Sequence, residues 1–160
     1  MSKKIKPNLS CFETVDYLLA KAAAEEEGSE LISNLKLQKL LYYAQGVHLA
    51  LHDIPLFPEE IQAWMHGPVV PAVYQKYKDS GYEALPSPEP GTVDFSRYTD
   101  EEKETLDEIY RVFGQFSAWR LREMTHGEPP WQEHFRDGAT HIVISQEAMR
   151  RYFKTQLESE

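Results

Sequence analysis

The chain has 160 residues, of which 41% are hydrophobic and 12% aromatic, and it carries 17 Lys and Arg against 26 Asp and Glu. This composition excludes a disordered chain, and the formal net charge of −9 argues against a nucleic-acid binder, which would need a basic face. No apolar run approaches the ~20 residues of a membrane span, the N-terminus lacks an apolar signal segment, and the single Cys11 excludes an internal disulfide. We expect one cytoplasmic domain over residues 1–160, with its core at about 9–157.

Capping residues and apolar spacing predict two helices in the first third of the chain. Ser10 and Glu13 form a capping box, so a helix should run from there to about Glu26. A stronger pattern runs from about Asn34, and its apolar stripe consists of Leu37, Leu40, Leu41, Ala44, Val47, His48 and Leu51. Lys36, Gln38, Lys39 and Gln45 lie off this stripe. Gly46 costs about 1 kcal/mol relative to Ala inside a helix, which indicates that another helix approaches closely there.

The middle of the chain alternates between short elements and turns. Residues 61–65 alternate in polarity, which predicts a short extended segment. Gly67-Pro68 predicts the start of a third helix, with Pro68 near its first position, and Gly81 predicts its end. Residues 83–98 contain three prolines and predict a proline-rich surface loop.

The second half predicts further helices with short connections. The expected elements are a helix from the capping box Thr99–Glu102 to Gly114, a shorter helix capped by Ser117 that ends near His126, a turn at Pro129-Pro130-Trp131, an extended segment at 141–144, and a final helix capped by Ser145. Segments 61–65 and 141–144 are candidates for pairing with each other. The fold class is therefore mainly α: a compact single domain of about six helices with one minimal two-stranded β ribbon.

Residue spacing predicts no catalytic centre. His48 and His52 lie four residues apart but lack the Glu of an HExxH motif, and Pro129-Pro130 separates His126 from His134. Cys11 opens a packed helix, where a buried thiol is the usual outcome. We therefore predict no catalytic residue, no metal, no cofactor and no enzymatic activity.

The aromatic residues point to a protein partner instead. Tyr42 and Tyr43 are adjacent on one helix, and at about 100° per residue they should not both face the core. The same reasoning applies to Tyr74, which is close to Tyr77, and to Trp64, whose neighbours Ala63 and Met65 are expected to face the core. Some of these aromatic side chains should therefore be partly exposed. Partly exposed aromatic side chains are common anchors of protein interfaces. The alternative is that they cover the edges of a small core.

Four separated motifs resemble one known family. They are Leu37–Gly46, Ala63–Pro71, Leu121–His126 with the following Glu128, Pro129 and Trp131, and Ile144 with Tyr152-Phe153. From about Leu9 to Phe153 the chain resembles the Panacea, or SocA-like antitoxin, domain family, whose members are often labelled phage-associated. The resemblance implies a helical antitoxin that neutralises a cognate toxin by direct protein contact, in one branch as an adaptor to a AAA+ protease. The acidic charge and the lack of a long apolar run predict no direct contact with nucleic acid or membrane.

We expect two turns, Trp64–Pro68 and His126–Trp131, to present the partner-binding groups. The candidate partner-binding residues are Tyr42, Tyr43, Trp64, His66, Tyr74, His126 and Trp131. The alternative is that these residues brace the turns while the toxin docks elsewhere. Two other functions compete: a phage- or prophage-encoded protein that targets a host factor, and a metal-dependent hydrolase that uses the histidines.

Overall fold

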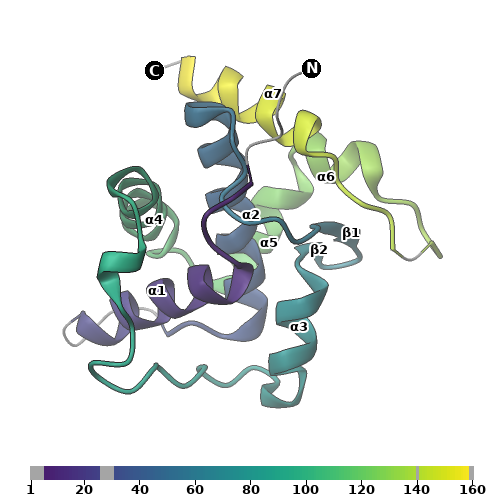
Figure 1. The fold of residues 1–160 in the computed structure, drawn as a ribbon. Helices are drawn as coiled ribbons and strands as arrows, with labels where there is room; N and C mark the ends of the chain where they lie inside the picture. Colours follow the sequence, from purple (N-terminus) through teal and green to yellow (C-terminus); the bar gives the residue numbers. More distant parts are fainter. Residues whose placement is uncertain (1–5, 26–30, 140, 159–160) are drawn as a thin grey trace.

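The computed structural model describes residues 6–25, 31–139 and 141–158, and this part of the chain is mainly α, as predicted (Figure 1). Its elements are the helices α1 (Cys11–Ala24), α2 (Asn34–His52), α3 (Pro71–Tyr77), α4 (Asp100–Phe113), α5 (Ala118–His126), α6 (Pro129–His134) and α7 (Gln146–Glu158), and the strands β1 (Gln62–Trp64) and β2 (Gly67–Val69). Short 3-10 turns lie at Lys78–Ser80 and Phe95–Arg97. None of the helices is long and apolar enough to cross a membrane, as far as the described residues go.

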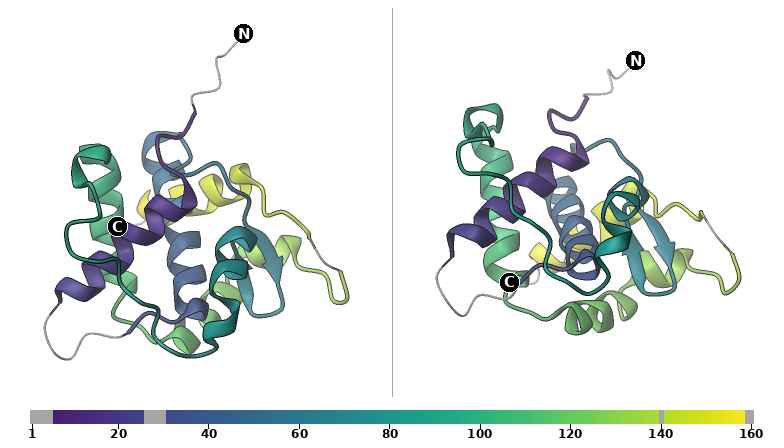
Figure 2. Two further views of the ribbon diagram at one scale, coloured as in Figure 1. Left: turned by 60° about the horizontal axis from the view of Figure 1, so that its bottom comes forward. Right: turned by 90° about the horizontal axis from the view of Figure 1, so that it is seen from below.

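Helix α2 runs through the centre of the molecule, and helices surround it on several sides (Figure 2). It contacts α1, α3, α4, α5 and α7. The polar residues off its apolar stripe are therefore buried as well: Lys36, Gln38, Lys39 and Gln45 are each at most 1% exposed. Leu51, expected in the stripe, is 53% exposed. An apolar stripe predicts burial on one face of a helix only. Because neighbouring elements cover most of the circumference of α2, the stripe failed to predict the buried residues on its other faces.

The C-terminal helix α7 crosses α2 at Gly46. A Cβ atom added to Gly46 would lie 2.2 Å from the ring carbons Cδ2 and Cε2 of Phe153 in α7. The close helix approach predicted from Gly46 is confirmed. Any side chain at this position would push α7 away from the central helix.

The prediction that Gly67-Pro68 starts a helix is wrong. Gly67 has a φ of +113° and opens β2, which pairs antiparallel with β1, with Pro68 opposite Ala63. The helix α3 starts three residues later, with Pro71 in its first turn. A glycine with positive φ is suited to a tight β-hairpin turn, and this competes with the helix-start interpretation of Gly-Pro.

The extended segment near residue 143 does meet β1, as expected. Gln62 and Val143 form an isolated antiparallel bridge, and the Ala63 N–H donates to the Ile142 carbonyl over 2.9 Å. The two-stranded ribbon itself is the β1–β2 hairpin. The expected turn at Pro129-Pro130-Trp131 is the first turn of α6.

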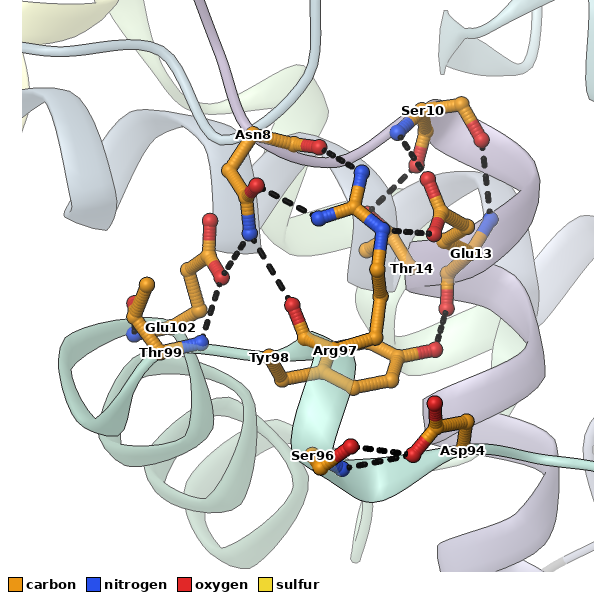
Figure 3. Close-up of polar contacts among 10 residues, drawn as sticks. All are labelled: Asn8, Ser10, Glu13, Thr14, Asp94, Ser96, Arg97, Tyr98, Thr99 and Glu102. Atoms are coloured by element: carbon orange, nitrogen blue, oxygen red, sulfur yellow. Dashed lines mark hydrogen bonds and ion pairs between the residues drawn. The ribbon is translucent and has the colours of Figure 1, made fainter.

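Both predicted capping boxes are present, and one polar network joins them (Figure 3). The Arg97 Nε lies 3.1 Å from the Glu13 carboxylate of α1, and the Asn8 amide donates to the Glu102 carboxylate of α4 over 2.9 Å. The Tyr98 hydroxyl donates to the Glu13 carbonyl oxygen over 2.7 Å. The proline-rich loop 83–98 therefore ends tied to the first turns of two helices.

Candidate partner-binding site

The two turns predicted to contact a partner lie side by side. The indole Nε1 of Trp131 in α6 donates a hydrogen bond to the main-chain carbonyl of Trp64 in β1 over 2.8 Å. The His126 ring stacks on the Trp131 ring, with 4.1 Å between centroids and 6° between planes, and Phe135 stacks on Trp131 at 4.7 Å. The two turns, which are 67 residues apart at this hydrogen bond, thus form one surface.

Polar and aromatic contacts extend this surface towards α3 and α5. The Arg122 Nε donates to the His66 Nδ1 over 3.1 Å, and its guanidinium lies 4.6 Å from the Trp119 ring centroid. The Trp64 ring meets the Tyr74 ring edge-to-face at 4.9 Å. The structure therefore brings together Trp64, His66 and Tyr74, three of the candidate residues.

These side chains line a groove with a volume of about 480 Å³. Its lining includes Lys39 of α2, Trp64 and His66 of the hairpin, Tyr74 of α3, and Trp119 and Arg122 of α5. Met65, at the hairpin turn, is 62% exposed and also lines a second hollow of about 410 Å³ on the Phe135 side. The hairpin turn thus separates two hollows.

Lys39 lies at the floor of the groove and has no solvent exposure. Its Nζ donates to the Pro68 carbonyl over 3.1 Å. Burial, with a smaller contribution from the nearby Arg122 charge, lowers the pKa of Lys39 to about 7. Gly67 makes room for this side chain, because a Cβ atom there would lie 2.7 Å from the Lys39 Cε. Sequence reasoning missed Lys39 because it lies off the apolar stripe.

The adjacent tyrosines of α2 lie inside the molecule, not on the surface. Tyr42 and Tyr43 are 0% and 1% exposed, so the prediction that both could not face the core is wrong. Their hydroxyls donate to the two carboxylate oxygens of Glu128, over 2.9 Å and 2.8 Å. Burial raises the pKa of Glu128 to about 7.

Comparison with known proteins assigns the chain to a family. Residues 37–132 match the family described as antitoxin SocA-like, Panacea domain, and this segment exceeds half of the chain. The chain belongs to this family. It is 47% identical over 64 residues to Antitoxin SocA of Caulobacter vibrioides (strain NA1000 / CB15N), an alignment covering 40% of this chain and 32% of that relative. The alignment thus spans about a third of the relative's length. No solved structure shows significant similarity.

The part of the Panacea domain that the family match covers contains both turns and the groove lining except Asn34 and Leu35. Lys39, Arg122, Glu128 and the Trp64–Trp131 hydrogen bond all lie within residues 37–132. His126 sits beneath this surface: its Nε2 is buried without a hydrogen-bond partner among the described residues. Burial, with contributions from the Arg122 and Lys39 charges, lowers its pKa.

His48 and Cys11 of this Panacea domain have structural surroundings. His48 shares a 2.8 Å hydrogen bond between its Nδ1 and the Thr105 hydroxyl, and burial lowers its pKa to about 4. Cys11 is buried, and burial together with Glu59 raises the pKa of its thiol to about 12. No group of three or more His, Cys, Asp or Glu side chains within the described ranges is placed to hold a metal ion.

Proposed function

We propose that this protein is an antitoxin that neutralises a cognate toxin by direct protein contact at the surface formed by the turns 64–68 and 126–131. Membership of the SocA-like antitoxin family and the similarity to Antitoxin SocA support the general role. The hydrogen bond from Trp131 to the Trp64 carbonyl carries the choice of surface, because it makes one continuous face of two turns far apart in sequence.

The candidate residues divide into contacting and supporting groups. Met65, His66 and Trp119 are exposed, and Trp64 and Tyr74 are half-buried beside them, so these side chains are available to a partner. His126 and Trp131 form a stack beneath the hairpin and hold it in position. Tyr42 and Tyr43 lie outside the contact surface because their side chains are buried.

The decisive experiment is co-expression with the product of the adjacent gene. That product should arrest growth when expressed alone, and this protein should restore growth. The Met65→Asp variant should fold with an unchanged Tm and fail to restore growth, because it places a charge on an exposed apolar contact. Equal growth arrest with and without this protein would overturn the antitoxin role and favour a phage-encoded protein that targets a host factor.

Leu51→Asp is the matched control, since Leu51 is 53% exposed on α2 and does not line the groove. It should restore growth as the wild type does. If Met65→Asp also restores growth fully, the toxin docks elsewhere and the two turns only brace the fold. Trp131→Ala should lose stability by about 3 kcal/mol, because it removes a stacked aromatic ring, and it therefore reports on bracing.

The fate of the toxin separates two modes of neutralisation. As an adaptor, this protein would deliver the toxin to a AAA+ protease, and the toxin's half-life would shorten when both are expressed. As a sequestering antitoxin, it would leave the half-life unchanged or lengthen it. A pulse-chase measurement of the toxin, with the Met65→Asp variant as the non-binding control, distinguishes the two.

A further inference from the structure

The groove beside the hairpin is basic, although the protein as a whole is acidic. Lys39, His66, Lys78 and Arg122 line it, and its lining contains no Asp or Glu. The whole chain has 26 acidic residues against 17 Lys and Arg. Among the described residues, Lys39, Lys78 and Arg122 take part in no ion pair. Basic side chains gathered without acidic partners in an acidic protein indicate an anionic ligand.

The basic side chain that can meet a ligand in this groove is Arg122. The Lys39 amino group donates to the Pro68 carbonyl and has no solvent exposure, so it adds positive charge behind the groove but is closed to a ligand. Arg122 is partly exposed and, among the described residues, takes part in no ion pair. A carboxylate entering the groove would give its guanidinium a charged acceptor.

The walls of the groove are apolar and aromatic. Trp64, Met65, Tyr74, Tyr82 and Trp119 surround the basic floor. Tyr82 is 94% exposed and Trp119 59% exposed, which leaves both rings free to cover an arriving side chain. Such walls suit an apolar side chain and give a polyphosphate backbone little to bind, and the net charge of −9 would repel a polyanion at long range.

We propose that this groove binds a segment of a partner protein in which a carboxylate lies next to an aromatic or large aliphatic side chain. The carboxylate interacts with Arg122, and the apolar side chain packs between Trp64, Tyr74 and Trp119. This inference rests on the proposed function in one respect: the proposed function identifies the partner protein as the toxin. The chemistry of the ligand follows from the groove.

Selection from a random dodecapeptide display library on the biotinylated full-length protein tests this chemistry. The enriched peptides should share an Asp or Glu adjacent to a Trp, Phe, Tyr or Leu. Synthetic versions with that acid changed to its amide should bind about tenfold more weakly, since a charge-assisted hydrogen bond is lost. Arg122→Gln should weaken binding of the acidic peptides by a similar factor.

Arg120→Gln is the matched control. Arg120 lies on the same helix as Arg122 but pairs with Glu123 and does not line the groove. It should leave peptide binding unchanged. Each variant is first checked for a wild-type circular dichroism spectrum and cooperative melting, which Arg122→Gln should keep because Arg122 is partly exposed. Three results would overturn the inference: no enriched peptide, enriched peptides without an acid, or equal binding by Arg122→Gln and Arg120→Gln.

The growth assay with the same variants separates this inference from the proposed function. Suppose acidic peptides bind and Arg122→Gln loses them, yet this variant still neutralises the toxin. The groove is then a carboxylate site, and the proposed toxin-contact surface is wrong. Suppose instead that Met65→Asp abolishes neutralisation while the selected peptides show no dependence on an acid. The toxin then binds at these turns, and the carboxylate inference is wrong.

Discussion

Glu128 and Lys39 are two ionisable side chains with opposite surroundings. Lys39 belongs to the central helix α2, and Glu128, just before α6, meets two tyrosines of the same helix. Glu128 accepts hydrogen bonds from Tyr42 and Tyr43, one at each carboxylate oxygen. Lys39 donates to one carbonyl. Burial raises the pKa of Glu128 and lowers the pKa of Lys39, in each case to about 7. The side chain with several partners links two parts of the fold, whereas the side chain with a single partner lies at the floor of a groove.

The hydrogen bonds to Glu128 also explain why two tyrosines are adjacent on α2. Their side chains leave the helix about 100° apart, and the two oxygens of one carboxylate lie between their hydroxyls. Helices on both sides then cover the rings, with Phe113 of α4 stacked on Tyr43 at 3.9 Å. Two adjacent tyrosines can therefore both be buried, because a single acidic residue accepts a hydrogen bond from each hydroxyl.

The largest expected effect comes from removing the acid at the centre of the tyrosine cluster. Glu128→Ala should lower the free energy of unfolding by about 3 kcal/mol, because it leaves buried hydroxyl groups without acceptors. Urea denaturation measures this loss. Glu133→Ala, on the exposed side of α6, the helix that Glu128 precedes, is the control and should change stability by less than about 0.5 kcal/mol. Equal stabilities for the two variants would show that the cluster is not a structural anchor.

The two groups should give stability opposite slopes with pH. Burial raises the pKa of Glu128 from 4.5 to about 7, so its contribution to stability is fully present below pH 4.5 and is lost as the pH rises through 7. Burial lowers the pKa of Lys39 from 10.5 to about 7, so its contribution is present above pH 10.5 and is lost as the pH falls through 7.

Urea denaturation across a pH series tests this contrast. Relative to wild type, Glu128→Gln should remove a falling slope below pH 7, and Lys39→Met a rising slope above it, each of at most about 1.4 kcal/mol per pH unit. His48, whose pKa burial lowers to about 4, adds an opposing slope at low pH to all three proteins, so the differences from wild type are the quantity to compare. Parallel profiles for the three proteins would contradict the prediction.

A smaller effect is expected from one tyrosine hydroxyl. Tyr43→Phe keeps the ring stacked on Phe113 and removes one hydrogen bond to Glu128, so it should cost about 1 kcal/mol. Tyr82→Phe is the control, since the Tyr82 side chain is almost fully exposed and should tolerate the change. Thermal melts of the two variants and the wild type at a single pH measure this difference in stability. No difference between the two variants would mean that the remaining tyrosines satisfy the carboxylate alone.

The smallest effect on stability is expected at Lys39. Lys39→Met replaces a buried, poorly paired ammonium by an apolar side chain of similar length, so stability should stay within about 1 kcal/mol of wild type or rise. The same urea experiment as for Glu128→Ala gives a direct comparison. A loss as large as that of Glu128→Ala would show that Lys39 also anchors the fold and would remove the contrast between the two sites.

Local sequence signals predicted much of this fold. The capping boxes at Ser10–Glu13 and Thr99–Glu102 are present, and a helix starts at each. They could be predicted from the sequence because a cap depends only on residues within one turn. Gly46 correctly predicted a helix crossing. Gly67 was misinterpreted, since its positive φ belongs to a hairpin whose register is set by pairing with β1.

The candidate site was predictable in part. The sequence motifs contained Trp64, His66 and Tyr74, which do lie together, but the hydrogen bond that joins Trp64 to Trp131 depends on tertiary packing. Lys39 and Glu128 could not be assigned from periodicity. Lysine on a helix is normally a surface residue, and only the burial of α2 on most sides makes its environment unusual.

The contact of Phe153 with Gly46 has a consequence for the synthesis of this protein. Helix α2 leaves the ribosome long before α7, and until residues 146–158 are made, the face of α2 around Gly46 has no helix over it. Domains generally fold as units during synthesis, so the nascent chain carries this face of α2 exposed until α7 emerges. A chain interrupted after residue 132 would contain both turns and the groove, yet it would display that face permanently and be prone to aggregation or proteolysis.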